Sequence, residues 1–187
     1  MREQSFAIFD TAIGACGIVW TRRGVCGVQL PEGSEAATRA RVLRRHAGAV
    51  EAAPPPDVRK AIDGIVALLA GEHADLSAIV IDDEDTPAFN AKVYAIARAI
   101  PPGETMTYGD IAKRLGDPLL ARDVGTALGE NKTPLIVPCH RVLAAGGKTG
   151  GFSATGGVVT KLQLLSIENA QPGGPTLFER LPLAVRR

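Results

Sequence analysis

The chain has 187 residues, of which 45% are hydrophobic and 22% are charged. This length allows one sizeable core or two small domains, and the composition is an ordinary globular balance. No apolar run approaches the length of a membrane span, and residues 1–6 hold no apolar signal core. We therefore expect no membrane partner and a cytoplasmic location.

The net charge of +1 is unevenly distributed along the chain. Residues 1–85 hold 9 Lys/Arg and 13 Asp/Glu, whereas residues 86–187 hold 12 and 7. A basic second half is typical of a module that faces nucleic acid, although ordinary scatter would also produce a difference of this size.

Short, β-rich runs open the chain and predict strands at residues 6–9, 17–20 and 25–30. Ser34 can cap a helix that continues to about residue 47. The four arginines of this helix, at positions 39, 41, 44 and 45, indicate a solvated face rather than a binding site. We expect this region to be an α/β unit.

A second helix is predicted after the prolines of the 52–56 linker, capped by Asp57 and closed by Gly71. Residues 77–81 are apolar and β-branched, which predicts another strand. The acidic run at 82–85 then marks the predicted boundary between domains 1–85 and 86–187.

The second half is predicted to be mainly helical. One helix starts at Thr86 and ends before Pro101, and residues 158–169 form the last helix. The segment after Gln171 is rich in Pro and Gly and is expected to be partly disordered.

Two short helices lie between these. Thr107 and Asp110 form a capping box for a helix that ends at Gly116, and Asp117 caps a helix that runs to about Glu130. The pair fits a helix-turn-helix motif and a plain helical hairpin equally well.

Three cysteines at unrelated spacings argue against a disulfide framework and indicate reduced thiols. Cys16 and Cys26 could join His46 and His73 in a zinc site. Their spacing fits no compact zinc pattern, and both cysteines lie in apolar, β-like runs. Core packing is therefore the favoured interpretation, and we expect no metal.

The most informative stretch runs from Ile136 to Val142, with the sequence Ile-Val-Pro-Cys-His-Arg-Val. A thiol is a weak nucleophile until it loses its proton, and an imidazole can assist that loss. Pro138 stiffens the turn before Cys139. Because adjacent side chains diverge, we expect His140 to reach Cys139 through a water or a local reorientation. An isolated Cys-His pair would favour a buried structural cysteine.

The flanking residues favour a catalytic cysteine instead. Asn131 lies eight positions upstream, the Gly-rich run 146–153 follows, and residues 161–168 read Lys-Leu-Gln-Leu-Leu-Ser-Ile-Glu. With residues 100–112 and 121–125, this pattern resembles the O6-alkylguanine-DNA alkyltransferases. The match is close over about residues 86–169 and general over 1–85.

The resemblance implies an α/β, ribonuclease-H-like N-terminal scaffold. It also implies a mainly helical C-terminal domain in which a winged-helix-like helix-turn-helix binds DNA. The family moves an alkyl group from O6 of guanine to its own cysteine and uses each molecule once, without a cofactor. Some relatives carry zinc in the first domain.

The resemblance assigns four catalytic residues. Cys139 corresponds to the acceptor, His140 to the base that acts through a water, and Glu168 to the carboxylate that orients the imidazole. Asn131 corresponds to the residue that holds the turn. Glu168 could instead be a solvated helix-end residue, and Asn131 a helix C-cap.

The implied partner is double-stranded DNA containing O6-alkylguanine, bound through its minor groove with the target base flipped out. Arg122 corresponds to the residue that fills the vacated stack, and Tyr108 to the one that contacts the target phosphate and the leaving base. A solvated arginine and a packed aromatic are the alternatives. Arg141 is also expected to bind DNA, and we expect a monomer.

The base pocket is expected to include the backbone of Val142 and the side chains of Phe152, Ser153 and Lys161. Phe152 stands where tyrosine is common, and the loop after Ser153 is about two residues longer than in many relatives. Lys132 replaces a usual proline, and Asp123 replaces a small residue.

Three other functions fit parts of the sequence. A non-catalytic protein that binds alkylated lesions would lack the cysteine, and a helix-turn-helix regulator would need an effector segment. A Cys-His hydrolase would take its base from a distant part of the chain.

Overall fold

A four-stranded sheet forms the base of the N-terminal half in the computed structural model, which describes residues 3–170. Its strands run in the order β3-β2-β1-β4. The first three pair antiparallel and β4 pairs parallel with β1. Their bounds are β1 Ser5–Phe9, β2 Cys16–Thr21, β3 Gly24–Gln29 and β4 Val50–Glu51. The predicted first three strands are confirmed, whereas the sequence did not indicate β4.

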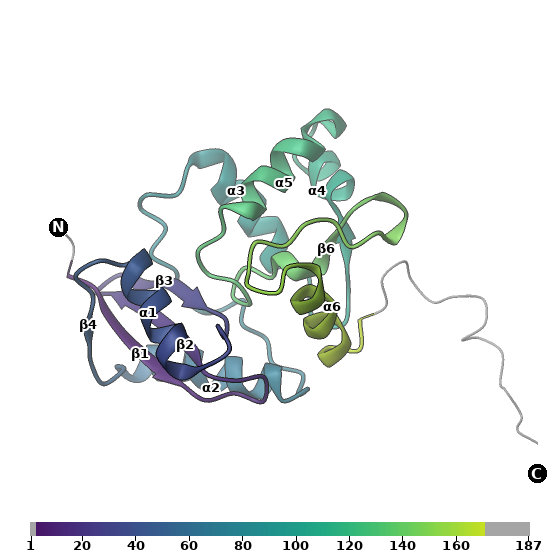
Figure 1. Ribbon diagram of the computed structural model, residues 1–187. Helices are drawn as coiled ribbons and strands as arrows, with labels where there is room; N and C mark the ends of the chain where they lie inside the picture. Colours follow the sequence, from purple (N-terminus) through teal and green to yellow (C-terminus); the bar gives the residue numbers. More distant parts are fainter. Residues whose placement is uncertain (1–2, 171–187) are drawn as a thin grey trace, which may run out of the picture.

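Two helices cover opposite faces of this sheet (Figure 1): α1 (Glu35–Arg45) and α2 (Pro56–Leu69). Strand β2 alternates between them, because Ile18 and Trp20 join the core beneath α2 while Val19 joins the core beneath α1. Gly17 lets α1 approach closely, since a Cβ there would lie 2.7 Å from Val42.

Two local predictions in this half are wrong. Helix α2 begins at Pro56 with Pro55 as its N-cap and no side-chain cap, so Asp57 lies inside the first turn. Residues 77–81 form turns rather than a strand, and only Ile81 bridges to Val25. The N-cap at Ser34 is confirmed, because its side chain accepts a hydrogen bond from the Ala37 amide.

The C-terminal half is mainly helical, as predicted. Its helices are α3 Ala88–Arg98, α4 Tyr108–Arg114, α5 Ala121–Gly129 and α6 Val158–Ile167. Short 3-10 turns are η1 Pro118–Leu120, η2 Cys139–Arg141 and η3 Ala145–Gly147, and the parallel strands β5 Met106–Thr107 and β6 Val142–Leu143 pair. The Thr107–Asp110 capping box is confirmed. Asp117 caps η1 rather than α5.

The two halves share buried surface. Leu135, Ile136 and Leu164 belong to the same hydrophobic cluster as the α2 face of the sheet, and the Val28 amide donates to the Lys132 carbonyl (2.9 Å). A second cluster lies among α3, α4, α5 and the cysteine turn. The predicted partial disorder after Gln171 concerns residues outside the described range.

Candidate functional site

Asn131 fixes the turn that carries Cys139. Its side-chain amide donates to the Val137 carbonyl (2.8 Å) and to the Cys139 sulfur (3.4 Å). Its amide oxygen accepts from the backbone of Thr133 (2.9 Å), so the donor side of the amide faces the sulfur. Asn131 is 6% exposed, which makes these bonds a buried and oriented set. Glu130 is the C-cap of α5, so the C-cap interpretation of Asn131 is wrong, and its side-chain bonds hold the cysteine turn instead.

Cys139 begins η2, is 8% exposed, and belongs to the second hydrophobic cluster. Burial raises the pKa of its thiol, against the hydrogen bond from Asn131 and the charge of Lys161, which favour the thiolate. The resting side chain is therefore a thiol at neutral pH. A separate base must remove its proton at the moment of reaction.

His140 and Glu168 form a buried pair, in which Nε2 of the imidazole lies 2.8 Å from a carboxylate oxygen. Burial lowers the pKa of His140 more than Glu168 raises it, so the ring is neutral at neutral pH. A carboxylate can only accept, which places the ring proton on Nε2 and leaves a lone pair on Nδ1. Nδ1 is buried and has no hydrogen-bond partner among residues 3–170.

Glu168 stays ionised because it has three charge-assisted bonds. Burial alone would raise its pKa, but hydrogen bonds from His140 and Arg141 and the positive charge of Arg141 lower it from 4.5 to about 2. Arg141 donates to both carboxylate oxygens, at 2.9 and 2.8 Å. The solvated helix-end interpretation of Glu168 is wrong, since its side chain is 2% exposed.

The expectation that Arg141 binds DNA is also wrong. Its guanidinium group is enclosed by Glu168 and by the Ile100 carbonyl, to which it donates at 2.6 Å, and the residue is 5% exposed. An arginine so placed cannot reach a phosphate. It neutralises the buried carboxylate and ties the cysteine turn to the end of α3.

Lys161 lies wholly inside the site, on the first turns of α6. Its ammonium donates to the Val142 carbonyl (2.6 Å) and to the Gly151 carbonyl (3.4 Å), and it lies 5.8 Å from the Tyr108 ring centroid. Burial lowers the pKa of Lys161 to about 8. Burial raises the pKa of Tyr108, so its hydroxyl keeps its proton at neutral pH.

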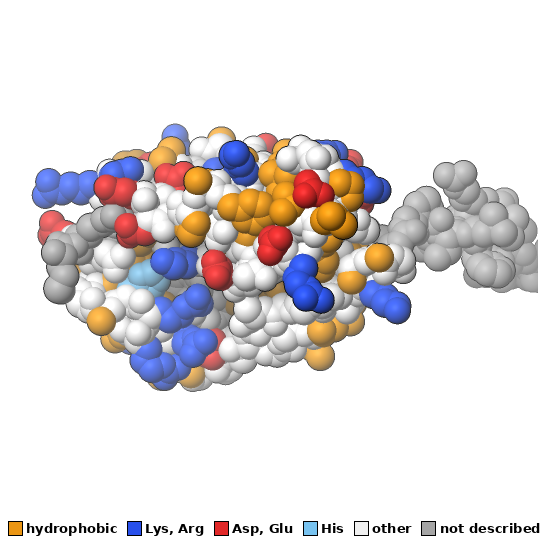
Figure 2. Space-filling model, turned by 90° about the horizontal axis from the view of Figure 1, so that it is seen from above, with side chains coloured by type: hydrophobic (Ala, Val, Ile, Leu, Met, Phe, Trp, Pro, Cys, Tyr) orange, Lys and Arg blue, Asp and Glu red, His pale blue; other side chains and the backbone are white. Residues whose placement is uncertain are grey.

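Arg122 and Asp123 are exposed in the first turn of α5. Asp123 forms no ion pair with Arg114 in the described part of the chain, although the sequence allowed one. Figure 2 looks down on the side where α3, α4 and α5 lie, and shows a hydrophobic patch with acidic and basic side chains around it. Leu119, just before α5, is 88% exposed.

The hollow beside Cys139 is small, with a volume of about 30 Å³. Phe152 and Ser153 line it together with residues of the N-terminal half, whereas Val142 and Lys161 of the expected base pocket do not. A larger hollow of about 780 Å³ lies between the halves, but neither Cys139 nor His140 lines it. Of these two hollows, the smaller one is the one that Cys139 lines.

The other two cysteines lie elsewhere. Cys16 is fully buried in the core beneath α2, and burial raises its pKa to about 12, so it packs as a hydrophobe. Cys26 is half-buried on β3. Within residues 3–170, no three His, Cys, Asp or Glu side chains lie close enough together to hold a metal ion. No helix in that range is long and apolar enough to span a membrane.

The amino-acid sequence of this chain is similar to those of known proteins. Residues 88–170 match the family described as 6-O-methylguanine DNA methyltransferase, DNA binding domain. The methylated-DNA–protein-cysteine methyltransferase of Methanothermobacter thermautotrophicus is 32% identical over 84% of this chain and 81% of its own. The protein of that name from Mycobacterium tuberculosis is 41% identical over 64% of this chain and 70% of its own.

A solved structure gives the same result. Mycobacterium tuberculosis OGT in complex with DNA superposes with a TM-score of 0.71 at 30% identity, covering 88% of this chain and 92% of that one. A buried cysteine with an adjacent histidine and a carboxylate, on this α/β-plus-helical fold, defines a self-alkylating protein class. The chain belongs to the methylated-DNA–protein-cysteine methyltransferase family.

The sequence missed several contacts of the site. Arg141 as the partner of Glu168 could have been inferred from the need to neutralise a buried carboxylate. No sequence signal indicated that Glu32, Arg41 and Arg45 of the N-terminal half would lie at the cysteine hollow.

Proposed function

We propose that Cys139 accepts an alkyl group directly from O6 of guanine in DNA and that each molecule reacts once. The observation that carries this proposal is the buried pair of His140, the residue after Cys139, and Glu168, with a lone pair left on Nδ1. A thioether has no leaving group that water can displace, so the product would be permanent.

The proton path follows from the histidine tautomer. A bridging water takes the thiol proton of Cys139 and passes one to Nδ1 of His140, and Glu168 stabilises the imidazolium that forms. The thiolate then attacks the alkyl carbon, the new C–S bond replaces the C–O6 bond, and guanine leaves with the electron pair. Asn131 holds the sulfur by its weak hydrogen bond.

The departing base needs a proton or a positive neighbour. Tyr108 keeps its hydroxyl proton at neutral pH and can donate it as guanine leaves. Lys161 lies 5.8 Å from the Tyr108 ring and would favour the phenolate that results. Val142, Phe152 and Ser153 would form the base pocket.

Two findings support DNA as the partner: the family to which the chain belongs, and the similarity to the solved structure of Mycobacterium tuberculosis OGT in complex with DNA. The exposed position of Arg122 at the start of α5 fits a residue that enters the minor groove and replaces the flipped base.

We also propose a ribonuclease-H-like scaffold in residues 1–85 and a winged-helix-like domain in residues 86–187. We further propose that the protein is a monomer and that it is located in the cytoplasm, where its three free thiols would stay reduced.

A lesion-binding protein without chemistry is the second candidate. Such a protein would need the pocket but not the proton path. The oriented Asn131 amide and the Glu168 carboxylate favour chemistry, because both serve the cysteine turn rather than a ligand.

The test is intact mass after incubation with a duplex that contains O6-methylguanine. We expect a gain of one methyl group, located on the peptide that contains Cys139, and none in Cys139→Ala. Methyl on Cys16 or Cys26, or transfer by the alanine variant, would refute the assignment. Binding without any mass change would support the lesion-binding alternative.

A further inference from the structure

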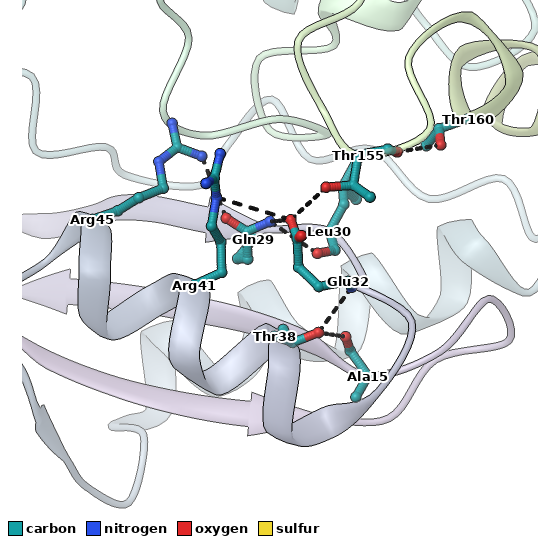
Figure 3. A network of polar contacts seen from close by, with 9 residues as sticks. All are labelled: Ala15, Gln29, Leu30, Glu32, Thr38, Arg41, Arg45, Thr155 and Thr160. Carbon is teal, nitrogen blue, oxygen red and sulfur yellow. Dashed lines mark hydrogen bonds and ion pairs between the residues drawn. The ribbon is translucent and has the colours of Figure 1, made fainter.

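A carboxylate of the N-terminal half holds the loop that covers the cysteine. Glu32 lies between β3 and α1, and its Oε1 accepts from the hydroxyl of Thr155 at 2.6 Å, across 123 positions of sequence. The same oxygen accepts from Gln29 at 2.9 Å. Figure 3 shows this carboxylate beneath the loop, with Arg41 and Arg45 of α1 beside it.

Both ends of this contact are held in place. The Glu32 amide donates to the hydroxyl of buried Thr38 (3.0 Å), which in turn donates to the Ala15 carbonyl (3.1 Å). On the other side, the Thr160 hydroxyl at the start of α6 donates to the Thr155 carbonyl (2.6 Å). The contact therefore joins two fixed backbones and restrains residues 152–156.

The restrained loop closes the site. The hollow beneath it, lined by Cys139, Ser153 and Thr155, measures about 30 Å³, whereas pockets that bind small molecules are about 300 Å³ or larger. A purine cannot fit in this hollow. A base that approaches Cys139 from this side therefore requires the loop to move outward.

The Glu32 carboxylate has a second possible partner, Arg41, when the loop moves away and the bond to Thr155 is lost. The Nε atom of Arg41 lies 4.0 Å from Glu32 Oε1, is buried, and has no hydrogen-bond partner among the described residues. A carboxylate released by Thr155 can take a charge-assisted bond from this guanidinium. The new bond offsets part of the loss, so opening the loop costs less free energy than the Thr155 bond alone would require, and the closed state stays the more stable one.

We propose that Glu32 is a positioning residue for alkyl transfer. Its hydrogen bond to Thr155 holds the 152–156 loop closed over Cys139. When the Glu32 carboxylate changes its partner from Thr155 to Arg41, the loop opens and the base can enter. The proposal rests on the proposed function, because it assigns to the closed loop the role of limiting access to that cysteine.

The decisive variant is Thr155→Val, which keeps the shape of an exposed side chain and removes the hydroxyl. A hydrogen bond to a charged group is strong enough that its loss should raise the open fraction about tenfold or more. Single-turnover reaction with free O6-benzylguanine should show a half-saturating concentration lower by about the same factor. The limiting rate constant should not change, because the reacting groups are untouched.

Three further proteins isolate the contact. Thr155→Ser keeps the hydroxyl and should behave as the natural protein. Thr126→Val removes an exposed hydroxyl that bonds only within α5, and should also have no effect. In the double variant Glu32→Ala/Thr155→Val, the second substitution should add little, since each substitution alone removes the same interaction.

A measurement that does not depend on alkyl transfer separates the two proposals. Iodoacetamide labelling of the Cys139 peptide, followed by mass spectrometry, should be faster in Thr155→Val even if no alkylated guanine reacts. Unchanged labelling together with an unchanged half-saturating concentration would overturn the role of Glu32. A lower limiting rate with no change in half-saturation would overturn it as well, because the loop would then serve chemistry rather than access.

Discussion

The substitution Glu168→Gln tests the central electrostatic arrangement of the site. The lowered pKa of this carboxylate, from 4.5 to about 2, corresponds to about 3 kcal/mol of folding free energy. Its side chain is 2% exposed, so solvent screens it little. Glutamine keeps the shape but leaves the Arg141 guanidinium without a counter-charge. Loss of one partner of a buried pair destabilises by about 3–5 kcal/mol at neutral pH.

The pH dependence gives the sign of the effect. Because the folded-state pKa of Glu168 is lower than the unfolded value, the unfolded chain binds the proton first as the pH falls. The contribution is complete above about pH 4.5 and is lost between pH 4.5 and 2. The gap in unfolding free energy between the natural protein and Glu168→Gln should therefore narrow by about 1 kcal/mol between pH 7 and pH 3.5. Urea titrations at both pH values measure the gap, and Glu104→Gln controls for the loss of one exposed carboxylate.

The same variant should lose chemistry. Without the carboxylate, His140 no longer has its proton fixed on Nε2, and transfer from free O6-benzylguanine should slow by about 10²–10⁴-fold. Adding Arg141→Met should recover part of the stability, because the unpaired charge is removed, but none of the rate. A gap in unfolding free energy that stays constant with pH, or a rate within threefold of the natural protein, would refute the reasoning.

Three other substitutions test the remaining assignments. Arg122→Ala should slow repair of duplex DNA about tenfold or more and leave reaction with the free base nearly normal, because only the duplex requires unstacking; equal losses would contradict this. Asp123→Ala should tighten binding to unmodified duplex by up to about fivefold, most at low salt; equal affinities in a salt titration would place Asp123 away from DNA. Tyr108→Phe should slow transfer from both substrates by about 10²-fold without loss of stability; an unchanged rate would remove its hydroxyl from the mechanism.

The sequence alone determined the local elements and the reacting group. The strands of residues 5–30 and the Thr107–Asp110 capping box were predictable because each depends on residues a few positions apart. The Pro-Cys-His-Arg-Val motif with its flanks indicated the family and Cys139. These signals are short-range, so they do not depend on how distant segments pack.

Only the tertiary structure decided the partners of the charged groups. Residues 77–81 look like a strand, but Arg98 donates to the Ser77 and Ile79 carbonyls at 2.5 and 2.6 Å and stabilises a turn instead. Arg141 looks like a DNA contact until burial places it against Glu168. Glu32 and Thr155 meet because β3 and the loop before α6 pack on one shared core. A long-range pairing of this kind depends on the whole fold, whereas the residues on either side of Glu32 carry no sign of it.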